Sequence, residues 1–262
     1  MAAGLILACA AIAAESGPGQ VPVPTPALPA GVPADWWQRA QSHIRASEYR
    51  WSWRPTPWPD TPQAWQAPNR AHNIRTYLGP DGFRMVPRTG DTQVWEWGLR
   101  LTGYGAAGAL GAVPPGEIAV NGPRAELFRG PLTEWYVNDE RGLEQGFSLE
   151  DPPVLDPTAP SPPTGAIVAL ELAVTGTLQP APLPGGIIEF RTAAGEAVMR
   201  FGGLKAQDDT GRELPVRLEL VERGQAPGAP EAPALRITVD AAGACYPICV
   251  DPLAWAVAGL KE

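Results

Sequence analysis

The sequence predicts a mainly β protein, in which antiparallel β-sandwich type sheets follow one N-terminal helix. Two observations lead to this fold class. Apolar and polar residues alternate in many short runs, as they do in half-buried strands. The 262 residues also include 32 prolines and 29 glycines, a composition that favours tight turns between strands.

The first 34 residues read as a signal-like segment followed by a proline-rich linker. The apolar run Leu5–Ala14 is shorter than the ~20 residues that span a bilayer and fits the apolar core of a secretory signal, although no basic residue precedes Arg39. The residues around Cys9 resemble a bacterial lipoprotein cleavage box, with Cys9 as the lipidated residue. We expect an exported protein, extracellular or at the cell surface, that touches a membrane only through this lipid anchor.

Residues 35–150 should hold the helix, a Trp- and Pro-rich clasp and a first β unit. Asp35–Arg50 is the expected helix, with Asp35 as its N-cap and an apolar stripe through Trp37 and Ile44. The tryptophans between Trp36 and Trp65 form either a clasp packed on the sheets or a sugar-stacking surface.

The β pattern begins near Asn73, and its clearest strand predicts a core face. Trp95, Trp97, Leu99 and Leu101 alternate with polar residues and should be buried together. A proline-rich linker at 151–163 either separates this unit from a second β unit at 164–253 or joins two halves of one sandwich. A loosely held tail should occupy 254–262.

The second β unit should end in a strand over Tyr246–Leu253, paired with Leu235–Asp240 through a turn at Asp240–Gly243. Cys245 and Cys249 should remain free thiols, because residues four apart in a strand lie ~13 Å from each other, and a disulfide needs about 7 Å or less.

The sequence offers little for catalysis or cofactor binding. The glycines of Gly103–Gly108 match GxGxxG, but Pro114-Pro115 arrives too soon for the helix that a nucleotide site needs, so we expect a flexible glycine loop. No serine-hydrolase, zinc-protease, P-loop or EF-hand motif occurs. The net charge of −8 argues against a nucleic-acid partner. We therefore expect no catalytic residues, no metal and no cofactor.

The segment Leu132–Phe147 is the most distinctive passage and supplies the candidate ligand-binding residues. Trp135 or Tyr136 would stack on a ligand, with Asn138 and Asp139 in a polar turn beside them. The same pattern is also typical of a sheet core that ends in a polar turn. The carboxylates of this segment, namely Glu134, Asp139, Glu140 and Glu144, would offer a pair for glycoside hydrolysis.

Four segments also resemble the domain that precedes FG-GAP (integrin-α-like) propeller repeats in large exported bacterial proteins: WQAPNRAHNIRTYLGPDGFRMVPR, LTEWYVNDERGLEQGF, GLKAQDDTGRELP and YPICVDPL. The resemblance spans Asp35–Leu253 and implies an extracellular, all-β, non-enzymatic module. The sequence departs from the propeller pattern in two ways: it has no DxDxDG calcium loop, and no propeller follows YPICVDPL before Glu262.

Three functions follow as hypotheses. The first is a non-catalytic exported structural or interaction module, whose partner is an unknown protein or a cell-surface polysaccharide. The second is a carbohydrate-binding module with exposed Trp or Tyr, and the third is a glycoside hydrolase. Exposed stacking aromatics would favour the second hypothesis, and two facing carboxylates roughly 5–9 Å apart in a cleft would favour the third.

Overall fold

The computed structural model describes residues 28–55, 63–89, 95–130, 132–153, 167–221 and 232–257. Its strands form two antiparallel sheets, accompanied by one short helix, so the predicted fold class is confirmed. Cys9, most of the expected leader and most of the 151–163 linker lie outside the described residues. No helix in the described ranges is long and apolar enough to cross a membrane.

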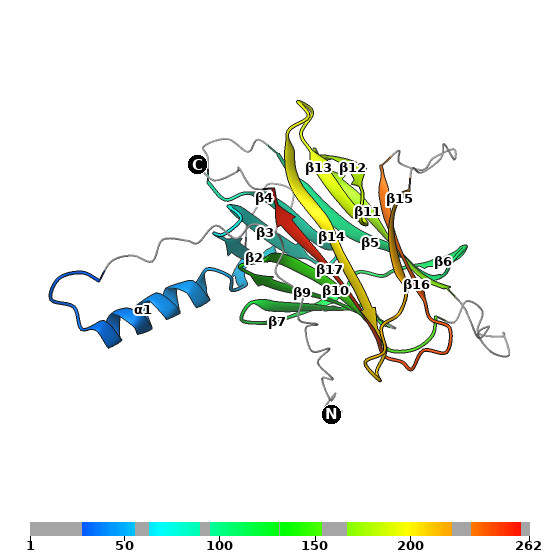
Figure 1. The fold of residues 1–262 in the computed structure, drawn as a ribbon, viewed down its shortest axis with the longest axis horizontal. Helices are drawn as coiled ribbons and strands as arrows, with labels where there is room; N and C mark the ends of the chain where they lie inside the picture. The colour runs from blue at the N-terminus through cyan, green and yellow to red at the C-terminus, as the bar shows by residue number, and fades with distance from the viewer. Residues whose placement is uncertain are drawn as a thin grey trace.

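Each sheet combines strands from both sides of the expected linker (Figure 1). The first sheet runs in the order β1 (Ser52–Arg54), β2 (Ala64–Asn69), β3 (Ile74–Gly79), β4 (Gly82–Pro87), β5 (Trp97–Ala106), β11 (Ile167–Gly176), β16 (Ala234–Asp240) and β15 (Val216–Val221), with β6 (Ala109–Ala112) paired to β5. The second runs β12 (Gln179–Leu183), β13 (Ile187–Arg191), β14 (Ala197–Gln207), β17 (Ile248–Ala256), β10 (Gly142–Leu149), β9 (Leu132–Asp139), β8 (Arg124–Phe128) and β7 (Glu117–Asn121). The two sequence-defined β units therefore do not form separate sheets.

The core lies between the two sheets, and the predicted face of β5 lies within it. Trp95, Trp97, Leu99 and Leu101 are all buried, as expected. The ring of Trp97 lies 4.6 Å from that of Phe190 in the second sheet. These contacts make one continuous apolar layer across the sandwich.

Helix α1 covers Ala34–Ser47, so it begins one residue before and ends three residues before the expected bounds. Asp35 is not the cap, because the Trp37 amide donates to the Pro33 carbonyl and Asp35 lies in the first turn. There its carboxylate pairs with Arg39 at 2.8 Å. Figure 1 shows α1 extending away from the sheets, and Trp36 is 54% exposed.

The Trp-rich segment divides into a packed part and an exposed part. Trp51 is buried edge-on to Tyr136, at 6.4 Å between ring centroids, and its Nε1 donates to the Pro123 carbonyl. This tryptophan acts as the expected clasp onto the second sheet. Trp53 is 47% exposed and meets Trp65 edge-on at 5.5 Å.

Glycine and aspartate build two of the turns, and the predicted glycine loop is wrong. Gly79–Gly82 joins β3 to β4, and Gly82 has a φ of 146°. At Asp208–Gly211 the Asp208 carboxylate accepts the Thr210 and Arg212 amides. The glycines of Gly103–Gly108 do not form a flexible loop, because the residues up to Ala106 are in β5 and only the last two make the turn into β6.

The predicted pairing of the last strand is also wrong. β17 lies in the second sheet, between β10 and β14, and does not pair with β16. The turn at Asp240–Gly243 therefore precedes a crossing between sheets and not a hairpin. β17 also continues to Ala256, past the expected boundary at Leu253. Cys245 and Cys249 do not form a disulfide, as expected.

Candidate functional site

The four predicted ligand-binding residues lie on β9, and three of them are fully buried. Trp135, Tyr136 and Asn138 expose 1% or less of their surface, and Asp139 is partly exposed. Neither ring is therefore available as a stacking platform. Tyr136 and Trp135 point to opposite faces of the second sheet, as neighbouring residues in a strand do.

Tyr136 faces the core and belongs to a buried polar cluster. Its hydroxyl donates to Glu134 Oε1 at 2.5 Å, and Gln145 Nε2 donates to the same oxygen at 2.8 Å. Arg129 Nε reaches Glu134 Oε2 at 2.7 Å, with both side chains buried. Burial and the neighbouring Glu134 carboxylate raise the pKa of Tyr136 well above its usual range. The Tyr136 hydroxyl therefore keeps its proton and serves as a fixed donor.

Trp135 packs on the other face of the sheet, across a glycine. A Cβ at Gly146 would overlap the indole ring, so only glycine fits opposite this tryptophan. The guanidinium of Arg124 lies 4.8 Å from the ring centroid, within cation–π range. With only 1% of its surface exposed, Trp135 has no ring face that a sugar could contact.

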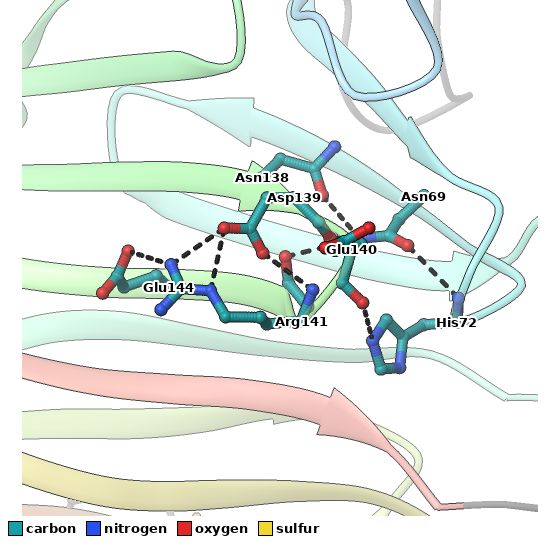
Figure 2. A network of polar contacts seen from close by, with 8 residues as sticks. Asn69, His72, Asn138, Asp139, Glu140, Arg141 and Glu144 are labelled. Carbon is teal, nitrogen blue, oxygen red and sulfur yellow. Dashed lines mark hydrogen bonds and ion pairs between the residues drawn. The ribbon is translucent and has the colours of Figure 1, made fainter. Parts of the chain in front are cut away.

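Asn138 joins the two sheets at one corner of the sandwich. Asn69 Nδ2 donates to Asn138 Oδ1 at 2.9 Å, and it also donates to the Asp139 carbonyl at 2.7 Å. Asn138 Nδ2 donates to the carbonyls of Tyr49 and Pro68. Figure 2 shows these amides meeting between β2 and β9. The polar turn that we predicted is present, but its amides bind the protein's own backbone.

His72 connects the corner of the sandwich around Asn138 to the end of β17 through hydrogen bonds. The Ala256 amide donates to His72 Nδ1 at 3.1 Å. His72 Nε2 lies 3.0 Å from the Glu140 carbonyl (Figure 2). Because Nδ1 accepts, the ring proton is on Nε2, which donates to that carbonyl. Segments that are far apart in the sequence are thus held together at one point.

Two carboxyl groups, Glu144 and Asp251, form what we call the acid pair. Their side chains are hydrogen-bonded to each other, and they expose 2% and 6% of their surface. Arg141 lies 3.1 Å from Glu144 and 2.8 Å from Asp139 (Figure 2). Burial, followed by the hydrogen bond and charge of Glu144, raises the pKa of Asp251 to about 8, while Arg141 and Lys205 act in the opposite direction. Asp251 therefore keeps its proton at neutral pH and donates it in the hydrogen bond to Glu144.

The buried carboxyl groups described above do not match the arrangement that a glycosidase uses. A glycosidase needs two carboxyl groups separated by the width of a sugar or a water. The two carboxyl groups of the acid pair are hydrogen-bonded to each other, and Glu134 is bonded to Arg129 in the core. In the described ranges, no group of three or more His, Cys, Asp or Glu side chains is arranged to hold a metal ion.

Sequence reasoning missed Arg129 and Asp251 as partners of the distinctive segment, and it missed the bond between Gln145 and Glu134 within it. Asp251 lies on a strand that was expected to pair with Leu235–Asp240, so no local pattern could have paired it with Glu144. A scan against models of protein families gives no match for the chain, and no curated protein sequence matches it.

Proposed function

We propose that the protein is an exported, non-catalytic β-sandwich module with a structural or interaction role, of the kind that precedes FG-GAP repeats. The observation that carries this proposal is the internal use of polar groups in the distinctive segment. Glu134, Asn138 and Glu144 each bond to the protein itself. Such a pattern stabilises a scaffold and leaves these groups unavailable to a substrate.

The segments that carry the resemblance support the same proposal. They correspond to β2–β4, to the β9–β10 hairpin, to β14 with its Asp208 turn, and to β17. These elements contain the residues that fasten one sheet to the other, including Asn69, Asn138 and His72. The resemblance therefore rests on parts of the fold that hold the sandwich together.

Export is tested with the full chain fused to alkaline phosphatase, which is active only outside the bacterial cytoplasm. We expect phosphatase activity that is lost when residues 1–14 are deleted. Cys9→Ser should leave export intact and move the fusion from the membrane fraction to the soluble exported fraction. Equal activity with and without residues 1–14 would refute the export proposal.

A carbohydrate-binding role is the second candidate, and one observation favours it. Trp53 is 47% exposed and is held edge-on by Trp65, as a stacking platform would be. Affinity electrophoresis in gels that contain surface polysaccharides tests this role. Trp53→Ala should abolish any retardation, whereas Trp36→Ala, which removes a similarly exposed tryptophan from α1, should not. Equal retardation of both variants would exclude Trp53 as the platform.

A further inference from the structure

β15 forms one edge of the first sheet, and it differs from both edges of the second sheet. It is regular over Val216–Val221 and pairs only with β16. At the neighbouring edge of the second sheet, β12 carries Pro180 and Pro182, which have no amide to donate. β7 is the other edge of the second sheet. Backbone hydrogen bonds hold both of its ends, one from the Gly116 amide to the Pro80 carbonyl and one from the Trp51 amide to the Gly122 carbonyl.

The pairing with β16 fixes which backbone groups of β15 face outward. The Asp240 amide donates to the Pro215 carbonyl, so these two residues form a hydrogen-bonded pair in this ladder. Such pairs alternate along antiparallel strands, so Arg217, Glu219 and Val221 also bond to β16. The N–H and C=O groups of Val216, Leu218 and Leu220 point to the open edge. In the described part of the chain, no backbone partner is found for them.

The side chains of β15 make this edge self-complementary. Arg217 and Glu219 are exposed on one face, while Val216, Leu218 and Leu220 are half-buried against the core. In an antiparallel pair with a twofold axis at Leu218, Arg217 lies opposite Glu219 of the second copy. Residues 216, 218 and 220 then lie opposite 220, 218 and 216, so every outward N–H meets an outward C=O.

The charges already present in the sheet extend into this arrangement. Glu171 on β11 pairs with Arg236 on β16 at 2.9 Å, and Arg236 lies directly opposite Glu219 on β15. Arg217 of a second copy would continue this row with the next opposite charge. The outward backbone groups of β15, its antiparallel register and its charges are therefore all complementary to β15 of a second copy.

We propose that two copies of this chain associate through antiparallel pairing of their β15 strands, which makes one continuous sheet across a twofold axis. This inference concerns a surface separate from the corner described above and does not depend on the proposed function. Half-buried Leu218 and Leu220 would become covered by the symmetry-related strand.

Sedimentation velocity of the full chain over a concentration series tests the dimer. We expect Arg217→Glu and Glu219→Arg each to raise the dimer dissociation constant about tenfold, because each places like charges opposite each other twice. The double variant, which exchanges the two charges, should return to within about twofold of the wild type. Glu117→Lys, on the exposed face of β7, is the charge-matched control and should leave the constant unchanged.

A backbone variant checks the hydrogen bonds. Leu218→Pro removes an outward amide without removing a bond to β16, so it should give a monomer with an unchanged circular dichroism spectrum. If this variant does not fold, the charge series decides. A wild type that stays monomeric up to about 100 µM would overturn the proposal. So would a dimer that is indifferent to both single reversals.

Discussion

The two faces of the second sheet bury carboxyl groups in opposite ways. On the inward face, Glu134 is matched by the guanidinium of Arg129 and by the donors of Tyr136 and Gln145. On the outward face, Glu144 and Asp251 are hydrogen-bonded to each other, and Arg141 is shared with Asp139. The first arrangement supplies an opposite charge, and the second retains a proton.

This difference shows that burial of an acid has two solutions with different weaknesses. A matched ion pair fails when one partner is removed, because the other charge is then buried alone. A proton-sharing pair fails when the proton leaves, because two negative charges then lie side by side. The free energy of unfolding should therefore change mainly with mutation of the ion pair on the inward face, and mainly with pH through the acid pair on the outward face.

The largest expected effect is at the matched pair. Arg129→Met leaves Glu134 buried without a counter-charge and should lower the free energy of unfolding by about 3–5 kcal/mol in urea titrations. The double variant Arg129→Met/Glu134→Gln should recover part of this loss, since it removes both charges. A loss below about 1 kcal/mol for the single variant would show that the pair is not the counter-charge device described.

The second effect distinguishes the acid pair by pH. The folded-state pKa of Asp251, about 8, lies above the ordinary value of about 4, so the unfolded chain releases this proton first. The Asp251 contribution is complete below pH ~4, falls as pH rises towards about 8, and is then constant. It should amount to a few kcal/mol.

The check is the free energy of unfolding measured between pH 4 and 9 for the wild type and for Asp251→Asn. The variant carries no titrating group at this position and should lose the Asp251 part of the decline. Identical profiles for the two proteins would show that Asp251 does not hold the proton.

A smaller effect tests how tightly the outward face is packed. Gly146→Ala places a methyl group against the Trp135 ring and should cost about 1–3 kcal/mol through overpacking. Gly111→Ala is the control, because its Cβ would lie at an ordinary 3.6 Å from the Tyr104 carbonyl oxygen. Equal unfolding midpoints for both variants would contradict the close packing of Trp135.

The smallest effect should come from Asp139, whose side chain is 34% exposed beside Arg141. Asp139→Asn weakens one partly exposed ion pair and should cost less than about 1 kcal/mol in thermal unfolding. The decline of stability with pH should persist in this variant, since Asp251 is unchanged. Loss of that decline would mean that Asp139 belongs to the proton-sharing group.

Local patterns predicted the strands well because alternation is a local consequence of having one buried face. Trp97 and Leu99 alternate with polar neighbours, and both are buried. The same rule does not explain Glu134, whose carboxylate faces the core because Arg129 and Tyr136 donate hydrogen bonds to it there. No spacing in the sequence indicates that Glu134 binds these two residues.

Long-range pairing was the other element that the sequence did not reveal. The last strand follows β16 closely, and short connections normally join neighbouring strands. Here β17 crosses to the second sheet, where Phe147 and Ala206 both lie opposite Val250. The acid pair depends on this crossing, so it was unpredictable from the residues that form it.

The central place of β17 has a consequence for the order of events during synthesis. β10 and β14 neighbour β17 but not each other, so the second sheet remains two fragments, β7–β10 and β12–β14, until residue 256 has left the ribosome. Both fragments then wait with open hydrogen-bonding positions, which are prone to pair with the wrong chain. Completion of this sheet is therefore a late event in folding, timed by the arrival of a single strand.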